Sequence, residues 1–400
     1  MPSALNQDAL KQDALRIALF TYATKPRGSV IHTVELAEAL QRLGHEVCIY
    51  ALDKDGTGFH RTLASCAQLI PAAPVAGGID RLIQQRIQEF VDFLGNGHLQ
   101  AQPYDCYHAQ DCISANALLR LRQQRQIPHF ARTVHHIDAF NSPYLQSCQE
   151  KSILEPDLCF CVSDYWQAEL QQQYGIDALR VLNGVNRDRF LPVNPEAIAQ
   201  LKQRLGISGY PVYLTVGGIE PRKNSIALLQ AFTQVLRQYP QAQLVIAGGA
   251  TLFDYQAYRD AFFTEVANLE LEASHLILPG VIADSDLPTL YQAANAFVFP
   301  SLKEGWGLVV LEAIASGLPI LTSRQPPFTE FLSDQQALLV NPHQPAAIAQ
   351  AMQQMIQPDV AKSLMDQSQP LCEFYTWDHS ARLHVDGYRR LLTASQICDH

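Results

Sequence analysis

Residues 16–52 read RIALFTYATKPRGSVIHTVELAEALQRLGHEVCIYAL and alternate two kinds of apolar pattern. The run Arg16–Ala23 is mostly apolar and predicts a buried strand. The polar turn TKPRGS follows it, and the next segment has apolar residues at the spacing of a helix. These residues are Val30, Val34, Ala37 and Leu40.

The ends of this helix and the segment after it complete the pattern. Ser29 is placed to cap the start of the helix, and Gly44 is placed to end it. Val47–Leu52 then predicts a second strand. A strand, a helix and a second strand in this order form a βαβ unit, so the two strands pair in parallel through a right-handed crossover.

The same alternation continues along the chain. Further apolar runs that predict strands are 104–109, 129–134, 158–162, 179–182, 212–216, 244–247, 276–278, 296–299 and 320–322. Helical stretches separate most of them, which predicts two doubly wound α/β domains with parallel sheets. Two prolines and several polar residues interrupt the pattern at Arg187–Pro195. We therefore predict domains at 1–187 and 188–376, and a terminal helix within 377–400 that packs back on the first domain.

The composition of the 400-residue chain bounds its function. Hydrophobic residues make up 48% and charged residues 17%, which is typical of a globular protein with a large core. The net charge of −10 argues against a general nucleic-acid binder. A local concentration of arginines leaves peripheral membrane contact open, although a solvated helix face is the simpler interpretation. These arginines are Arg120, Arg122, Arg125 and Arg132.

Neither a leader nor a membrane span is expected. Met1–Arg16 is polar and mixed in charge, unlike a signal peptide, and no stretch approaches about 18 apolar residues. The nine cysteines are scattered without a CxxC pair. We therefore expect reduced thiols and a cytoplasmic protein, with contact to the inner face of a membrane left open.

The most informative segment is 297–322, FVFPSLKEGWGLVVLEAIASGLPILT. A buried strand ends at Pro300, a polar loop carries Glu304, and Gly305 and Gly307 lead into a helix. Glycines at a helix start let a ligand approach the backbone, and the free N–H groups there favour an anion. The simpler alternative is ordinary turn chemistry. A dinucleotide fingerprint fits poorly, because Val310 stands at the third glycine position.

Glu312 lies eight residues beyond Glu304. On a helix this spacing places Glu312 on the face of Gly305 and spans about 12 Å. A carboxylate pair for glycoside hydrolysis is closer, at about 5–9.5 Å. The spacing suits an extended ligand with an anionic middle, such as a nucleotide sugar, whereas a solvated glutamate is the alternative.

Two more segments place polar residues after predicted strands. In LTVGGIEPRKN (214–224), Gly217 and Gly218 end a strand, and Arg222 and Lys223 precede a helix. Cations at the carboxyl edge of a parallel sheet suit a diphosphate. In ARTVHHID (131–138), two histidines follow a strand, although a structural role is the commoner one for a histidine. They are His135 and His136.

Together these residues resemble the retaining glycosyltransferases of family four, which have the GT-B fold of two Rossmann-like domains facing a central cleft. PSLKEGWGLVVLEAIASGLPI (300–320) is similar to the E-x7-E signature of that family. The similarity extends over most of the chain. The other similar segments are 27–51, 162–175, 181–190, 216–224, 244–249 and 277–301.

The resemblance implies a role for each matching residue. In the second domain, Glu304 would face the donor sugar, Glu312 would bind the ribose, and Lys223 with Arg222 would neutralise the diphosphate next to Gly217 and Gly218. Backbone groups would make the remaining donor contacts. Those of Trp306 and Gly307 would contact the sugar, those of Leu308 and Val309 the diphosphate, and those of Ile282 the base.

The first domain would complete the machinery. The resemblance implies that His135, or less well His136, lies by the sugar and that Gly28 approaches the diphosphate. Gln110 and Asp111 follow a predicted strand and would line the acceptor side. Three departures from the family stand out: Gly218 replaces its usual Arg, for which Arg222 would compensate, Gly28 stands where a Gly pair is common, and Asn186 stands where Asp is frequent.

The implied reaction is transfer of a hexosyl group from a UDP- or GDP-sugar to a saccharide, lipid or small-molecule acceptor, with retained configuration. We expect neither a metal nor a cofactor, because Lys223, Arg222 and the helix start can stabilise the leaving diphosphate. Two alternatives remain open. One is a GT-B isomerase or epimerase that acts without an acceptor, and the other is a non-catalytic protein that binds nucleotide sugars.

Overall fold

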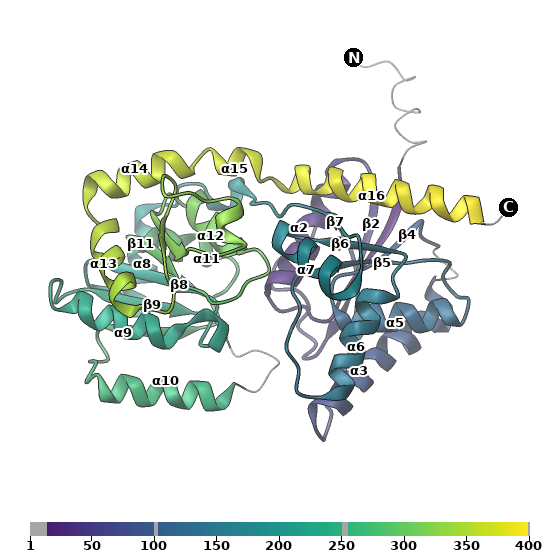
Figure 1. Cartoon of the computed structure of the whole chain (residues 1–400), viewed down its shortest axis with the longest axis horizontal. Coiled ribbons are helices and arrows are strands. Elements are labelled where there is room, and N and C mark those ends of the chain that lie inside the picture. The colour runs from purple at the N-terminus through teal and green to yellow at the C-terminus, as the bar shows by residue number, and fades with distance from the viewer. Residues whose placement is uncertain (1–13, 100–102, 250–254, 399–400) are drawn as a thin grey trace, which may run out of the picture. The chain divides into compact units, whose positions relative to one another are not determined.

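The chain passes twice between two structural units. The computed structural model describes residues 14–99, 103–249 and 255–398. One unit runs to Gly184 and resumes at Thr376, and the other is Val185–Tyr375 (Figure 1). The limits expected from the sequence, 187 and 376, lie within a few residues of these junctions.

In its described part, the first unit has a seven-stranded parallel sheet in the order β3-β2-β1-β4-β5-β6-β7. Its strands are β1 (Arg16–Thr21), β2 (Glu46–Asp53), β3 (Cys66–Pro71), β4 (Cys106–Ala109), β5 (Ala131–Val134), β6 (Leu158–Cys161) and β7 (Leu179–Arg180). Its helices are α2 (Gly28–Arg42), α3 (Ile79–Phe93), the π-helical turn Leu94–His98, α5 (Cys112–Gln123), α6 (Pro143–Leu154), α7 (Asp164–Tyr174) and α16 (Trp377–Cys398). The strand order reverses between β1 and β4, which is where ligands bind in sheets of this kind.

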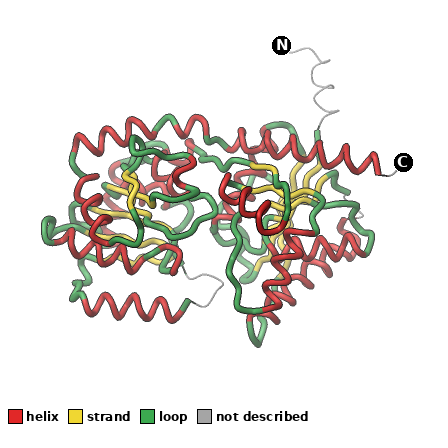
Figure 2. The backbone as a smooth tube through the Cα atoms, in the orientation of Figure 1, coloured by secondary structure: helices red, strands yellow, loops and turns green. Residues whose placement is uncertain are grey.

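Helices cover both faces of this sheet (Figure 2). Ala18 and Phe20 of β1 pack in one core with residues of α3, α5 and α6. On the other side α16 lies along α2, where Asp378 accepts two hydrogen bonds from Arg42, at 3.0 Å and 2.7 Å. The last helix of the chain is thus part of the first unit.

The second unit repeats the plan with a parallel sheet of six described strands, in the order β10-β9-β8-β11-β12-β13. Its strands are β8 (Val212–Val216), β9 (Gln243–Ala247), β10 (Leu276–Gly280), β11 (Ala296–Phe299), β12 (Ile320–Ser323) and β13 (Leu338–Val340). Its helices are α8 (Pro195–Leu205), α9 (Ser225–Leu236), α10 (Gln256–Asn268), α11 (Leu287–Ala293), α12 (Leu308–Ala315), α13 (Pro345–Met355), α14 (Pro358–Ser368) and α15 (Leu371–Phe374). Short 3₁₀ turns lie at Arg187–Phe190, Pro221–Lys223 and Phe328–Glu330. The order reverses here between β8 and β11.

The cap expected for α2 is wrong. The helix begins two residues earlier than predicted, Arg27 occupies the capping position, and its side chain forms no capping hydrogen bond. Ser29 lies inside the helix, where its carbonyl accepts a hydrogen bond from the hydroxyl of Thr33 at 2.7 Å. Helix formation here depends on the buried apolar face rather than on a polar cap.

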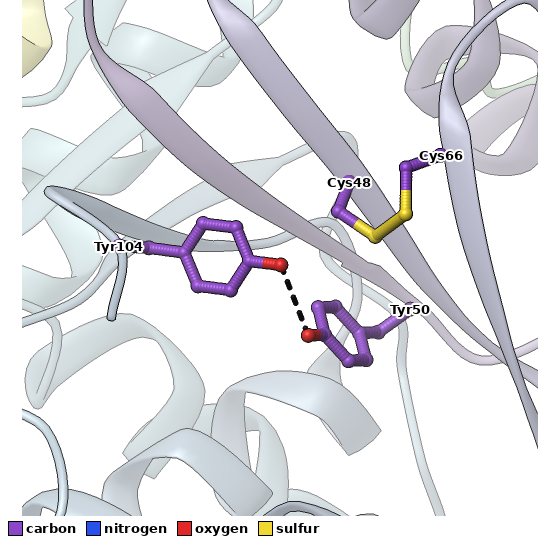
Figure 3. The surroundings of a disulfide bond; sticks show 4 residues. All are labelled: Cys48, Tyr50, Cys66 and Tyr104. Atoms are coloured by element: carbon purple, nitrogen blue, oxygen red, sulfur yellow. Dashed lines mark hydrogen bonds between the residues drawn. A yellow bond between two sulfur atoms is a disulfide. The ribbon is translucent and has the colours of Figure 1, made fainter. Parts of the chain in front are cut away.

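The expectation that all the thiols are reduced is also wrong at one pair. Cys48 of β2 and Cys66 of β3 form a disulfide beside the hydrogen-bonded pair Tyr50 and Tyr104 (Figure 3). The two cysteines are direct partners in the register of neighbouring strands, with Cα atoms 4.5 Å apart. β3 was not among the predicted strands, so this pairing could not be anticipated.

The arginines that cluster in the sequence between Arg120 and Arg132 do not form one surface patch. Arg132 is buried in β5, and Arg122 forms ion pairs with Glu155 and Asp157. In the described part of the chain, no helix combines the length and the apolar character needed to cross a bilayer.

Candidate functional site

The loops after β8 and β11 meet where the strand order of the second sheet reverses. Both strands are buried apolar runs whose carboxyl ends point to the same edge. The first loop carries Arg222 and Lys223, and the second carries Glu304. Asn224 ties the loops together, because its amide donates to the carbonyls of Pro300 at 3.1 Å and Pro342 at 2.7 Å.

Glu304 is the centre of this site. Its Oε1 accepts from Nζ of Lys223 at 2.6 Å, and its two oxygens lie 3.0 Å and 3.1 Å from Nη1 of Arg222. The hydroxyl of Ser301 lies 2.7 Å from the same Oε1. Nε of Arg222 in turn lies 3.0 Å from Oε2 of Glu220. Two carboxylates and two cations therefore form one connected group.

Burial and neighbouring charge set the protonation of this group. Burial alone would raise the pKa of Glu304, but Lys223 and Arg222 outweigh it and hold that pKa at about 2. Burial, reinforced by Arg222 and opposed by Glu304, lowers the pKa of Lys223 to about 8. At neutral pH Glu304 is an anion and most of Lys223 is a cation.

The position of Lys223 depends on glycine at 217. A Cβ atom on Gly217 would lie 2.7 Å from Cε of Lys223, and the φ of Gly217 is +146°. The ammonium also lies 4.5 Å from the centre of the Phe299 ring. Gly217 thus gives the lysine stem its space, which is a packing reason for a glycine there.

The helix after Glu304 starts later than the spacing argument assumed. α12 begins at Leu308, so Glu304 to Gly307 is loop and the two glutamates do not lie on one continuous helix. Gly307 has a φ of +104°, and a Cβ on it would lie 2.7 Å from the Phe328 ring. Its positive φ turns the chain so that the first amides of α12, at Leu308 and Val309, start the helix beside the site.

The side chain of Trp306 is turned into the core of the second unit. Its indole is buried and stacks on Phe331, with ring centres 4.3 Å apart and planes 8° apart, and it also contacts Tyr375. The side chain is therefore part of the core of the unit. Only the backbone of Trp306 is left for the ligand contact that the resemblance implies.

Glu312 is buried in α12 and already has a partner. Its Oε2 accepts from the hydroxyl of Tyr291 at 2.8 Å. Burial and Glu312 raise the pKa of Tyr291 well above its usual value, so Tyr291 remains a donor. Ile282, the residue implied to contact the base, lies half-buried two positions after β10.

The candidate residues of the first unit follow β1, β4 and β5 at the carboxyl edge of that sheet. Gly28 opens α2, and a Cβ on it would meet no atom within 4 Å, so packing alone does not require glycine there. Asp111 caps α5: its carboxylate accepts from the amides of Ser114 and Tyr22, both at 2.8 Å. His136 is exposed, with Nε2 3.1 Å from Asp138.

His135 is held by its neighbours in the neutral form. Its Nε2 lies 3.2 Å from Oε1 of Gln110, and an amide oxygen only accepts, so Nε2 carries the proton. Burial, helped by His32 and Arg132, lowers the pKa of His135 well below its usual value. The ring contacts that of His32, with centres 4.7 Å apart.

The structure brings together Glu304, Lys223 and Arg222 in the second unit, and Gln110 and His135 in the first. Sequence reasoning missed Glu220, Ser301 and Tyr291. Ser301 had a weak signal, because it follows a strand end three residues before Glu304. Glu220 and Tyr291 had no pattern of their own. Across residues 14–99, 103–249 and 255–398, no group of three or more His, Cys, Asp or Glu side chains could hold a metal ion.

Two sequence families match this chain in adjacent segments. The family described as "Glycosyltransferase Family 4" matches residues 26–189, and "Glycosyl transferases group 1" matches residues 198–368. Among curated proteins, the chain is 28% identical over 283 residues to the O-antigen chain mannosyltransferase B of Escherichia coli. That match covers 65% of this chain and 70% of the relative.

Solved structures resemble the whole fold. The sucrose-phosphate synthase of Thermosynechococcus elongatus superposes with a TM-score of 0.77 at 24% identity, covering 95% of this chain and all of that one. HepE of Anabaena, solved in complex with UDP-glucose, gives a TM-score of 0.73 at 17% identity, with 93% and 98% covered. These neighbours are GT-B glycosyltransferases, and the two Rossmann-like units described here have that fold.

Proposed function

Because the chain belongs to the glycosyltransferases of family 4, we propose that it transfers a hexosyl group from a nucleoside-diphosphate sugar to an acceptor with retained configuration. The observation that carries this proposal is the contact of Glu304 with Lys223 and Arg222, next to the start of α12. The UDP-glucose bound to the structurally similar HepE supports a donor of this class.

The proposed chemistry follows from the charges. The barrier is departure of the diphosphate from a sugar carbon that gains positive charge. Lys223, Arg222 and the first amides of α12 are placed at one edge of the sheet, where they would stabilise the negative charge that grows on the diphosphate. The Glu304 carboxylate would face the sugar, and Glu312 with its partner Tyr291 would take the ribose.

The roles in the first unit are proposals as well. Its carboxyl edge, with Gln110, Asp111 and the neutral His135, would receive the acceptor. His135 cannot act as a cation at neutral pH, because its pKa lies well below that range. We also propose that the reaction needs no metal ion, since Lys223 and Arg222 supply the charge a metal would bring.

Nucleotide release separates the proposal from its two alternatives. The protein is incubated with UDP- and GDP-sugars, in EDTA, with and without a panel of saccharide and lipid acceptors. A transferase releases nucleotide with an acceptor and forms a glycoside, whose anomeric proton coupling reports retention. Release with an altered free sugar and no acceptor would indicate an isomerase or epimerase, and binding without release would indicate a non-catalytic protein.

Replacing Lys223 tests the diphosphate role directly. Lys223→Ala should lower kcat/KM about 100- to 1000-fold, because a charged donor to the developing anion is lost from a buried site. Lys362→Ala, at an exposed lysine of α14, is the matched control and should leave activity unchanged. Near-normal activity and donor affinity in Lys223→Ala would show that the assigned role is wrong.

A further inference from the structure

Glu220 is a buried carboxylate that the proposed function leaves unused. Its side chain is 4% exposed and lies just before the 3₁₀ turn Pro221–Lys223. Its charged partner is Arg222, whose Nε lies 3.0 Å from Oε2. A buried carboxylate is costly unless it is paired, and this ion pair supplies the opposite charge, although Oε2 accepts no hydrogen bond in the structure.

An arginine could not replace glycine at 218. The φ of Gly218 is +76°, and a Cβ there would lie 2.7 Å from the carbonyl oxygen of Gly249. Gly248 is equally close on the same side, since a Cβ on it would lie 2.4 Å from the amide nitrogen of Gly218. These are backbone contacts, which cannot relax as a side chain does. The second cation of the site must therefore come from another position, and Arg222 is placed to supply it.

Arg222 is held from two sides. Nε faces Glu220, and Nη1 faces both oxygens of Glu304, while 35% of the side chain is exposed. The contact with Glu304 is a pair of hydrogen bonds from Nη1, whereas the contact with Glu220 is an ion pair that holds the charge of the guanidinium close to the buried carboxylate. If the Glu304 contact were lost, the attraction of Glu220 would still keep the guanidinium of Arg222 at this position.

The charges around Glu304 balance before any ligand binds. Glu220 and Glu304 carry two negative charges, and Arg222 and Lys223 carry two positive ones. A diphosphate would therefore compete with Glu304 for both cations, whereas Glu220 is ion-paired with Arg222 and acts on Lys223 through its charge. The carboxylate displaced from the two cations is therefore Glu304, which the family resemblance implies faces the sugar.

We propose that Glu220 is a positioning residue that anchors Arg222 while a bound diphosphate replaces Glu304 as the partner of Arg222 and Lys223. Glu304 is then released toward the sugar only when the diphosphate is in place. This inference rests on the proposed function, because it assigns the diphosphate to Lys223 and Arg222. In this proposal the donor is recognised in two steps: its diphosphate binds Arg222 and Lys223 first, and Glu304 contacts its sugar afterwards.

The sign of one affinity change tests the anchor. Glu220→Gln removes a negative charge beside an anion site, so charge alone predicts that UDP or GDP binds more tightly. Anchoring predicts the opposite: the variant should bind the nucleoside diphosphate about tenfold more weakly by titration calorimetry. UMP or GMP, which lack the second phosphate, should bind wild type and variant alike. Equal or tighter diphosphate binding by Glu220→Gln would overturn the inference.

A double-mutant cycle shows whether Glu220 acts through Arg222. In the Arg222→Ala background, Glu220→Gln should change diphosphate affinity less than twofold, because the anchored group is gone. A full additional loss there would point to a general structural role and would also overturn the inference. Glu220→Asp, which keeps the charge, should recover part of the affinity and serves as the folding control. If wild type binds neither UDP nor GDP, it is the proposed function that fails.

Discussion

The buried ammonium of Lys223 makes donor binding sensitive to alkaline pH. Its pKa of about 8 in the ligand-free protein means that it loses its proton as the pH rises through 8. A diphosphate binds the charged form, so the Kd for UDP or GDP should rise by up to about tenfold per pH unit above 8. Titration calorimetry between pH 7 and 9 measures this slope.

Lys223→Arg is the matched control for this pH dependence. A guanidinium stays charged throughout this range, so the affinity of the variant, even if weaker overall, should be independent of pH from 7 to 9. Equal slopes for wild type and variant would assign the titration to another group.

The sequence predicted some residues of the site but not the contacts between them. Lys223 and Glu304 were both named as candidates, because each follows a buried strand in a polar loop. Their direct contact was not predicted, since 81 positions separate them and only the pairing of β8 with β11 brings the loops together. Tyr291 was missed because a buried tyrosine in a helix looks like any core residue until its hydroxyl meets Glu312.

At the scale of elements, α16 is attached to the first unit around a group of buried imidazoles. The rings of His32 and His384 have centres 5.6 Å apart, and those of His108 and His384 lie 5.7 Å apart. The hydroxyl of Tyr388 lies 2.7 Å from Nδ1 of His108. These contacts join α2 and β4 to α16, so the packing of the terminal helix depends on neutral histidines.

Acid should therefore weaken the first unit before it affects most carboxylates. Burial lowers the pKa of His32 to about 4 and that of His384 to about 3, below the value of about 6.5 in an unfolded chain. The unfolded chain takes up these protons first, so stability is fully present above pH 6.5 and falls as the pH drops toward 4. Each imidazole contributes about 1.4 kcal/mol per pH unit to this loss.

His384→Phe checks this assignment. The variant removes one of the protons taken up on unfolding, so urea denaturation between pH 7 and 5 should show a shallower loss of stability than wild type. His343→Ala, at an exposed histidine of the second unit, should keep the wild-type slope. A slope unchanged by His384→Phe would exclude this residue as a source of the acid sensitivity.

The strands differ in how well their bounds could be predicted from the sequence. β8 and β11 have the bounds predicted from their apolar runs, because strands buried on both faces leave an unbroken signal. β3 and β13 were missed. Both lie at sheet edges: β3 is mostly exposed and has no continuous apolar pattern, and β13 is an apolar run of only three residues, too short to stand out.

At the scale of the whole chain, the two passages between the units are held together by backbone. The amide of Val185 donates to the carbonyl of Tyr375 at 3.0 Å. One residue earlier, a Cβ on Gly184 would lie 2.3 Å from both the carbonyl carbon of Thr376 and the amide nitrogen of Trp377. Only glycine lets the chain approach the start of α16 this closely.

Gly184→Ala should thus destabilise the protein by about 1–3 kcal/mol, because the clash is with backbone and no side chain can move aside. Thermal unfolding measures the loss. Gly78→Ala, before α3, is the control, since a Cβ there meets no atom within 4 Å. A Tm equal to that of wild type would mean that the two passages can separate at no cost.

Placing α16 in the first unit has a consequence for how the protein is made. A ribosome delivers the strands of that unit first, but the helix that covers His32 and His108 emerges only after the entire second unit. During translation the face of the first unit that α16 covers, which is lined by apolar side chains and imidazoles, stays exposed until α16 is made. The second unit can already fold in that time. Completion of the first unit is thereby tied to the arrival of α16, so a product that terminates within the second unit leaves the first unit unfinished.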